Sequence, residues 1–500
     1  MTDAPLLLGI DIGTTNLKAI VFDTTGQSVA QAAVRTPTYY PQPGWAYYDA
    51  EEIWQATSTA LRAVTSQIDA RQIVGLAVAS YGETGVPLDG TGNPTYHAIA
   101  WFDNRTAPQA AWLQAHLGLD AIFAATGCAL QPIFTLCKLR WLFEHAPETM
   151  ARTQRWLNMA DYIAYRLCGV AATDFSLASR MLTLDLQQQC WATDLLQAVA
   201  IPPALLAPLQ PSGTRLGAVL PEVATQTGLP PHAQVAVGGH DHVVGALGLG
   251  VTAFGDMLNS IGTAEAIFLP IAQPVRDPEF GSRGYSQGVH AAGGYYALGG
   301  LYTSGASVEW FRENFGGSAT YADLIAEAEA APAGSLGAFF LPHLRLANPP
   351  YVDAKARGAF IGLRTDVKLG ALFRALLEGL AYEVRHSLEP LLQYIRLPHI
   401  ERIYVAGGGA HNDLYTQVKA SVLNHPLHVV SVAESTALGA AVLGGIGAGL
   451  YPDLTSALQQ LRYAQRVVEP APTEIAIYEA GYQQVYRQLY GTLRSLHHAI

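Results

Sequence analysis

The residues with the clearest chemical potential lie at a turn between two apolar runs near the start of the chain. Asp11 stands at the end of the first run, Gly13 follows it, and Thr14 and Thr15 precede the second. Glycine lets a turn bring backbone N–H groups close to an anion, hydroxyls add donors, and a carboxylate can face a metal ion. The segment predicts a phosphate-binding hairpin, with an ordinary polar hairpin as the alternative. Lys18 could neutralise phosphate or lie on the exposed face of the second strand.

A second acidic residue, Asp241, follows the apolar strand expected over 234–237 and two glycines. An alcohol that attacks a phosphoryl group needs a carboxylate within hydrogen-bond reach to take its proton, while Mg²⁺ spreads the transferring charge. Asp241 suits that role, and a strand-end cap is the alternative. His240 and His242 flank it, but on an extended segment the three side chains cannot all face one ion, so we expect no shared metal coordination.

Other polar residues just beyond expected strands suit the recognition of hydroxyl groups. Glu83 and Thr84 follow the buried strand expected over 73–80, and Trp101 and Asp103 follow a short apolar strand. Open α/β sheets hold ligands at the carboxyl ends of their strands, where carboxylates accept hydrogen bonds from a polyol or sugar. Solvent-exposed loop carboxylates and a buried tryptophan are the alternatives.

Three consecutive glycines, Gly407, Gly408 and Gly409, remove side chains where a flat base or sugar could lie against the backbone, and Asn412 could bind the nucleotide. Alone, such glycines serve close packing equally well. Together with phosphate turns they predict a nucleotide site.

The second half of the chain repeats the first in outline. Residues 256–269 contain a strand, the turn Gly262–Thr263 and a second strand, in parallel with the opening hairpin. Residues 402–412 then run from a strand into the glycines, much as 73–83 runs into a glycine loop. Two such turns can clamp one phosphate chain. We therefore expect an α/β protein of two related lobes around a central cleft, divided near residues 245–255.

Composition agrees with a large, well-packed α/β protein. A chain of 500 residues exceeds what one hydrophobic core usually supports, and half of the residues are hydrophobic while only 14% are charged. The net charge of -11, with no concentrated basic run, gives nucleic-acid or anionic-membrane binding little support.

Three features bear on location. The four cysteines form no close pair and adjoin no histidine cluster, which is typical of thiols in a reducing compartment. The start lacks the features of a secretory signal, so the cytoplasm is the expected location. The Gly/Ala-rich helix expected over 437–450 is too short to span a bilayer, and close helix packing explains it better.

Together these motifs resemble the FGGY family of carbohydrate kinases, within the actin, Hsp70 and sugar kinase superfamily. The likeness covers nearly the whole chain in the family's order: residues 11–16, 135–142 with the helical Lys-x-x-Trp pattern, 239–242, 261–263, 357–363 leading into 375–379, and 407–412.

The resemblance implies two ribonuclease H-like, actin-like ATPase lobes. Residues 1–247 would form an N-terminal lobe that binds sugar and carries the catalytic Asp, and 248–500 a C-terminal lobe that binds ATP. The enzyme would transfer phosphate from MgATP to an alcohol group of a ketose, such as a pentulose, or of a polyol. Its partners would be small molecules, and a homodimer remains open.

The resemblance also assigns roles to residues. Asp241 would be the general base, and Asp11 with Asp241 would hold Mg²⁺. The residues expected to bind the substrate are Glu83, Thr84, Trp101, Asp103, His240 and Asp241. Those expected to bind the nucleotide are Gly13, Thr14, Thr15, Lys18, Gly262, Thr263, Gly305, Gly407, Gly408, Gly409 and Asn412.

Several departures bear on specificity. Xylulokinases commonly carry Met-His where this chain has Gly82, Glu83 and Thr84, which puts ordinary D-xylulose recognition in doubt. Glycerol kinases carry Arg-Glu-Thr there, so Gly82 lacks their guanidinium. The alternatives are a glycerol or erythritol kinase, a chaperone-like or filament-forming ATPase of the same superfamily, and a sugar-binding regulatory protein without catalysis.

Overall fold

The computed structural model describes residues 4–500 and forms two compact units. Unit 1 comprises the chain up to residue 252 together with 287–296 and 434–463. Unit 2 comprises 253–286, 297–433 and 464–500. The expected division into two continuous halves therefore differs from the structure in one large segment, 434–463, which packs within unit 1.

Unit 1 is built on a sheet whose central strands are parallel. Its strands follow the order β13 (Arg215–Ala218), β14 (Gln234–His240), β5 (Ile73–Ser80), β1 (Leu6–Ile12), β2 (Asn16–Phe22) and β3 (Ser28–Arg35). β1 and β2 form the predicted antiparallel hairpin, and β1, β5 and β14 run parallel. These three strands are almost continuously apolar because both faces of a parallel sheet are covered.

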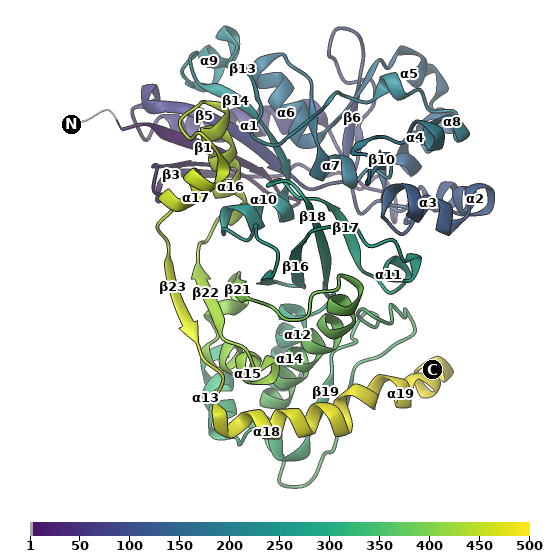
Figure 1. The fold of residues 1–500 in the computed structure, drawn as a ribbon, viewed down its shortest axis with the longest axis vertical. Helices are drawn as coiled ribbons and strands as arrows, with labels where there is room; N and C mark the ends of the chain where they lie inside the picture. The colour runs from purple at the N-terminus through teal and green to yellow at the C-terminus, as the bar shows by residue number, and fades with distance from the viewer. Residues whose placement is uncertain (1–3) are drawn as a thin grey trace. The chain divides into compact units, whose positions relative to one another are not determined.

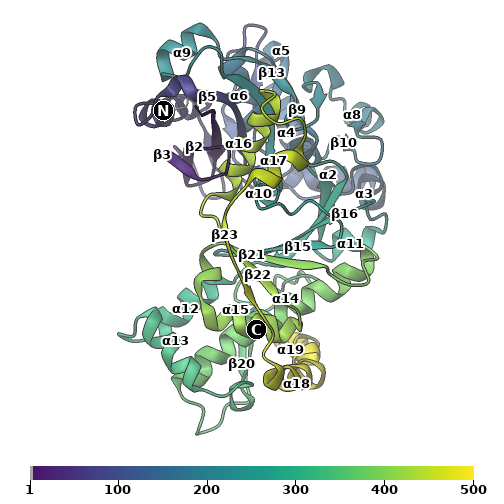
Figure 2. The same cartoon turned by 60° about the vertical axis from the view of Figure 1, so that its left-hand side comes forward.

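Helices cover this sheet. α1 (Ala50–Thr65) packs on β2 and β3, and α6 (Met159–Cys168) packs on β5 and β14. The Gly/Ala-rich helix α16 (Ser435–Gly447) lies against β1, β5 and β14 (Figures 1 and 2).

Glycines explain how α16 can lie so close to the sheet. A Cβ at Gly9 would come 1.8 Å from the carbonyl oxygen of Ala437, and one at Gly75 would come 2.2 Å from that of Gly444. The prediction that close packing explains this apolar segment is confirmed. Across residues 4–500 we find no helix with the length and apolarity needed to cross a membrane.

The stretch after β7 (Ala98–Ile99) is mostly helical, as the sequence predicts. It contains α2 (Ala107–Leu117), α3 (Leu119–Thr126), α4 (Thr135–His145) and α5 (Pro147–Arg152). These helices enclose a hydrophobic cluster separate from the one around the sheet of unit 1, with Leu139, Leu142 and Trp156 among its buried members. The helices therefore form a layer with its own core beside the sheet.

Unit 2 repeats the topology of unit 1. Its sheet has the strand order β17 (Ser286–Val289), β18 (Tyr295–Leu301), β16 (Glu265–Ile271), β15 (Asp256–Ile261), β21 (Arg402–Ala406), β22 (Leu427–Ser431) and β23 (Ala464–Val468). β15 and β16 form an antiparallel hairpin, while β21 and β22 continue parallel to β15. This arrangement matches that of β1, β2, β5 and β14, so the predicted internal repeat is confirmed.

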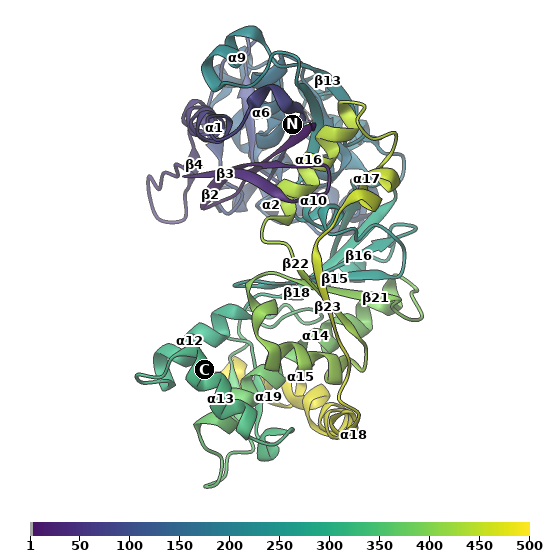
Figure 3. The same ribbon diagram turned by 90° about the vertical axis from the view of Figure 1, so that its left-hand side faces the viewer.

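Helices gather on one side of the sheet of unit 2 (Figures 2 and 3). They are α12 (Gly305–Phe315), α13 (Tyr321–Ala330), α14 (Leu369–Tyr394) and α15 (Asp413–Leu423). α14 is the framework of this layer because it packs on α12, α13 and α15.

Further helices and five short strand pairs complete the described elements. The helices are α7 (Phe175–Ser179), α8 (Thr193–Ala198), α9 (Pro221–Thr227), α10 (Asp241–Gly248), α11 (Pro278–Ser282), α17 (Leu454–Gln460), α18 (Pro472–Gly481) and α19 (Arg487–Ala499). The short strand pairs are β4 (Tyr47–Tyr48) with β7 (Ala98–Ile99), β6 (Gly85–Leu88) with β8 (Arg155–Asn158), β9 (Thr173–Asp174) with β12 (Leu209–Gln210), β10 (Leu184–Asp185) with β11 (Cys190–Trp191), and β19 (Phe339–Leu341) with β20 (Ala359–Ile361).

Candidate active site

The carboxyl ends of three neighbouring strands bring the predicted acidic residues of unit 1 together. Ser80 at the end of β5 is in register with Ile12 on one side and with His240 on the other. Asp11 therefore lies at the same sheet edge as Asp241, which is the first residue of α10. Burial and the charge of Asp241 raise the pKa of Asp11 to about 7, against the opposing effect of Lys18.

Asp241 has one carboxylate oxygen engaged and one available. The backbone N–H of His242 donates to Oδ1 at 2.6 Å, and Nε2 of His240 lies 3.4 Å from the same oxygen. Among residues 4–500 we find no donor to Oδ2. Burial raises the pKa of Asp241, while the charge and N–H of His242 oppose that shift. The free oxygen is suited to accept a proton from a bound hydroxyl.

The prediction of an extended His-Asp-His segment is wrong. β14 extends to His240 and α10 begins at Asp241, because an acidic side chain in the first helical turn interacts favourably with the free N–H groups there. His240 is buried whereas His242 is exposed. Within the described part of the chain no three His, Cys, Asp or Glu side chains gather as a metal site. A metal ion at Asp11 and Asp241 would therefore complete its ligand shell with water or substrate oxygens.

Glu83 is buried, so the alternative of an exposed loop carboxylate is wrong for it. Its side chain is 6% exposed and pairs with Arg180, whose Nε donates to Oε1 at 2.6 Å. Its backbone is left-handed, with φ of 60°. The hydroxyl of the neighbouring Thr84 is buried, and no described residue bonds to it. Glu83 and Thr84 thus lie in the interior beside Asp241.

Asp103 has a different role from the expected one. Its carboxylate is completely buried and accepts from the backbone N–H groups of Ala46 and Arg105 and from Nε and Nη2 of Arg105, all within 2.9 Å. These four bonds fill both oxygens. Asp103 holds the loop in place and has no acceptor left for a ligand, so we withdraw it from the expected substrate-binding residues.

Trp101 links the loop after β7 to the first phosphate turn, a contact that the sequence motifs do not predict. Its indole N–H donates to the hydroxyl of Thr14 at 3.0 Å. The turn itself is closed by the N–H of Gly13, which donates to the carbonyl of Asn16 at 3.1 Å. Trp101 therefore fixes the first phosphate turn, and its half-buried ring remains at the edge of the loop.

Lys18 forms an ion pair that the sequence did not reveal. Its ammonium lies 2.7 Å and 2.8 Å from the two carboxylate oxygens of Glu434. The two side chains are 31% and 27% exposed. Both residues belong to unit 1, although 416 positions separate them in sequence. A role in phosphate binding would therefore involve Lys18 together with its acidic partner.

In unit 2, the second phosphate turn meets the start of a helix. The N–H groups of Gly305 and Ala306 donate to the carbonyls of Gly262 and Thr263 at 3.0 Å and 3.1 Å. A Cβ at Gly305 would come 2.6 Å from the oxygen of Gly262, so only glycine allows this approach. The structure thus brings Gly262, Thr263 and Gly305 together as expected.

A buried polar cluster lies beneath this turn, and none of the sequence motifs predicts it. Glu265 at the start of β16 forms an ion pair with Lys419 of α15, and both side chains are completely buried. Glu265 also accepts from the hydroxyls of Ser304 and Tyr415 at 2.7 Å and 2.8 Å, while Lys419 donates to Asn259 at 2.6 Å. The cluster joins β15, β16, α12 and α15, the elements that carry the expected nucleotide residues.

The triple glycine lies against the strand that leads to the second turn. A Cβ at Gly407 would come 2.5 Å from the carbonyl oxygen of Ile261, and one at Gly409 would come 2.2 Å from its side chain. A Cβ at Gly408 would meet nothing within 4 Å, so this face of the loop is open. Asn412 caps α15 by accepting from the N–H of Tyr415 at 3.0 Å.

A cavity of about 300 Å³ adjoins the glycine loop. Its lining includes Ala410, His411, Asp413, Val429 and Arg466. The combination of an open backbone face, a partly apolar cavity and a neighbouring phosphate turn fits the base, sugar and phosphates of a nucleotide.

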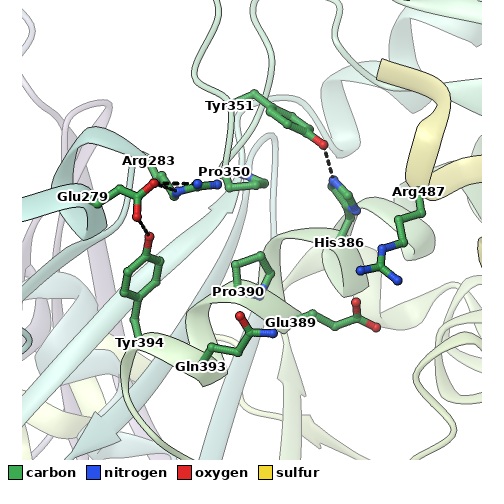
Figure 4. A pocket seen from close by; sticks show the side chains of 10 residues that line it. All are labelled: Glu279, Arg283, Pro350, Tyr351, His386, Glu389, Pro390, Gln393, Tyr394 and Arg487. Carbon is green, nitrogen blue, oxygen red and sulfur yellow. Dashed lines mark hydrogen bonds and ion pairs between the residues drawn. The ribbon is translucent and has the colours of Figure 1, made fainter. Parts of the chain in front are cut away.

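A larger cavity of about 600 Å³ in unit 2 lies among residues of α11, α14 and α19 (Figure 4). Several of its lining groups bind one another: Glu279 accepts from Arg283 at 2.6 Å and from the hydroxyl of Tyr394 at 2.9 Å, and His386 lies 3.0 Å from the hydroxyl of Tyr351. None of the sequence-predicted site residues lines it. We leave it outside the candidate site.

Comparison with known proteins agrees with this arrangement. The model of the N-terminal domain of the FGGY family of carbohydrate kinases matches residues 6–248, and that of the C-terminal domain matches 257–448. A xylulose kinase of Bacillus subtilis is 28% identical over 99% of this chain and 98% of its own. A glycerol kinase of a Nostoc species is 31% identical over 93% of each chain.

Solved structures show the same fold. The crystal structure of gluconate kinase from Lactobacillus acidophilus superposes with a TM-score of 0.90, at 25% identity and over 99% of both chains. The prediction of two ribonuclease H-like, actin-like ATPase domains is confirmed. The chain belongs to the FGGY family of carbohydrate kinases.

Proposed function

We propose that this carbohydrate kinase uses MgATP to phosphorylate a hydroxyl of a ketose, such as a pentulose, or of a short polyol, with Asp241 as general base. The observation that carries the proposal is the free Oδ2 of Asp241 at a sheet edge shared with Asp11 and next to Glu83. A carboxylate so placed can take the proton of an attacking alcohol.

We assign acceptor binding to unit 1 and nucleotide binding to unit 2. Glu83, Thr84, Trp101 and His240 would surround the acceptor. The turn Gly262–Thr263, Gly305 and the 407–409 loop would bind the nucleotide.

Asp11 and Asp241 would hold Mg²⁺. Their mutual repulsion, which contributes to the raised pKa of Asp11, is relieved by a cation, so the donor set fits a hard divalent ion. When bound, Mg²⁺ would neutralise charge on the transferring phosphates. We also propose a cytoplasmic location, which is supported by the four free cysteines.

Turnover with a panel of acceptors tests this function. ATP consumption is measured alone and with xylulose, glycerol and erythritol. We expect one neutral acceptor to raise consumption at least about 100-fold, on the scale of a single catalytic group. Sugar-independent turnover would instead support an ATPase of the same superfamily. If glycerol is the best acceptor, the result favours the polyol kinase. The Glu83–Thr84 pair, which matches the Glu-Thr of glycerol kinases, supports that alternative.

The buried ion pair under the second turn makes a separate prediction for unit 2. Replacing Lys419 by Met leaves Glu265 buried without its cation, which typically costs about 3–5 kcal/mol of folding free energy. We expect a lower melting temperature and a raised KM for ATP, with the acceptor KM little changed. The exposed Lys355→Met is the matched control. If Lys419→Met melts and binds ATP like the control, the cluster does not support the nucleotide site.

A further inference from the structure

An arginine outside all of the sequence motifs holds the Glu83 carboxylate. Arg180 follows α7, and its Nε and Nη2 lie 2.6 Å and 2.5 Å from Oε1 of Glu83. The side chains of the two residues are only 13% and 6% exposed. Because both charges are largely removed from water, each depends on the other for compensation.

The bare backbone at Gly82 makes room for this arginine. A Cβ at Gly82 would lie 3.0 Å from Cβ of Arg180 and 3.1 Å from Cδ2 of His240. Arg180, at the end of α7, and His240, the last residue of β14, therefore both lie beside this loop. His240 directly precedes Asp241. The guanidinium beside Glu83 therefore comes from Arg180, which is distant in the sequence, and not from position 82.

The main chain of Glu83 is fixed independently of its carboxylate. Its left-handed φ of 60° is a conformation that non-glycine residues adopt uncommonly. Its carbonyl accepts from Nζ of Lys138 at 2.8 Å and from the hydroxyl of Thr135 at 3.3 Å. Both donors lie on α4, within the Lys-x-x-Trp segment. These contacts set the direction in which the Glu83 side chain leaves the backbone.

The charges around this loop leave no cation for an anionic acceptor. The charge of Arg180 is compensated by Glu83 through Nε and Nη2, although its buried Nη1 has no hydrogen-bond partner among residues 4–500, and the carboxyl group of Asp241 lies nearby. Lys138 is completely buried and directed at a carbonyl, and burial lowers its pKa to about 7, so much of its charge is absent at neutral pH. In the described residues no donor reaches the second Glu83 oxygen, Oε2, which is therefore available to accept from a hydroxyl.

We propose that the Glu83–Arg180 pair makes the acceptor site selective for neutral hydroxyl compounds and against sugar acids. The inference rests on the proposed kinase function and narrows its substrate class. Glu83 would accept a hydrogen bond from the acceptor at Oε2, while Oε1 pairs with Arg180 and compensates its positive charge. A carboxylate on the acceptor would meet two like charges and an arginine already paired.

The test removes the counter-ion of Arg180 without changing the shape of the pocket. Glu83→Gln is isosteric with the native residue but neutral, so the guanidinium loses its counter-ion. The wild type, Glu83→Gln and the double variant Glu83→Gln/Arg180→Met are assayed with xylulose, glycerol and gluconate for kcat/KM. Glu51→Gln, which leaves Arg166 without its partner on the surface of unit 1, is the matched control. Affinity for ADP and the melting temperature report on folding.

We expect the preference for a neutral acceptor over gluconate to weaken when residue 83 loses its charge. The wild type should prefer its best neutral acceptor over gluconate at least 100-fold, and Glu83→Gln should lower that ratio at least 30-fold. The double variant should lose any gain with gluconate, and Glu51→Gln should keep the wild-type ratio. A wild type that accepts gluconate as well as neutral compounds, or a Glu83→Gln variant with an unchanged ratio, would overturn the role of the pair. Absence of turnover with every acceptor would refute the proposed function itself.

Discussion

Replacing Asp241 by Asn should lower the rate of phosphoryl transfer about 1,000-fold, within the range typical of a lost general base. Asn keeps an oxygen to accept from the N–H of His242 at the start of α10, so the backbone should remain in place. It cannot take the proton of the attacking hydroxyl. Because proton removal occurs in the transition state, kcat should fall while the affinity for ATP stays nearly unchanged.

The measurement is steady-state kinetics with the best acceptor, together with a direct ADP-binding assay. Asp453→Asn, which removes an exposed carboxylate at the start of α17 in unit 1, is the matched control and should retain wild-type rates. A fall in kcat of less than about tenfold for Asp241→Asn would remove this residue from the role of base.

Asp11→Asn should lower turnover about 100-fold and raise the Mg²⁺ concentration needed for half-maximal activity at least about tenfold, the scale on which lost partners of a metal shell act. The reason is electrostatic: Asp11 lies at the sheet edge beside Asp241, and a cation relieves their repulsion. Removing one charge weakens the attraction for Mg²⁺.

Titration with Mg²⁺ separates the two acidic residues. Excess Mg²⁺ should restore part of the activity of Asp11→Asn but none of the activity of Asp241→Asn, because only the latter lacks the proton acceptor. An unchanged Mg²⁺ requirement in Asp11→Asn would show that Asp11 does not contribute to metal binding.

Local patterns were sufficient for the strands and turns that carry the main motifs. The apolar runs of β1, β5 and β21 are bounded by glycine or polar residues, so their limits and the loops after them could be read directly. The repeat of hairpin and glycine loop gave the shared topology of the two sheets. Glycine at position 407 likewise marked backbone that another segment, at Ile261, approaches closely.

Contacts between distant segments could not be predicted in this way. Arg180 lies 97 positions from Glu83, and Glu434 lies 416 positions from Lys18, so no local period relates them. Asp103 was misjudged for the same reason, because its burial depends on the fold around Ala46. The expected continuous domain boundary missed α16, whose glycines pack on β1, β5 and β14, strands that come far earlier in the chain.

A single-turnover experiment with γ-labelled ATP shows directly whether the γ-phosphoryl group is transferred to the carbohydrate or to water. Enzyme in excess over ATP is mixed with the best neutral acceptor, and label is counted on the carbohydrate and in inorganic phosphate. We expect the wild type to place nearly all label on the carbohydrate and Asp241→Asn to place almost none there in the same time. Label released mainly as inorganic phosphate by the wild type, at a rate that the acceptor does not change, would contradict the account.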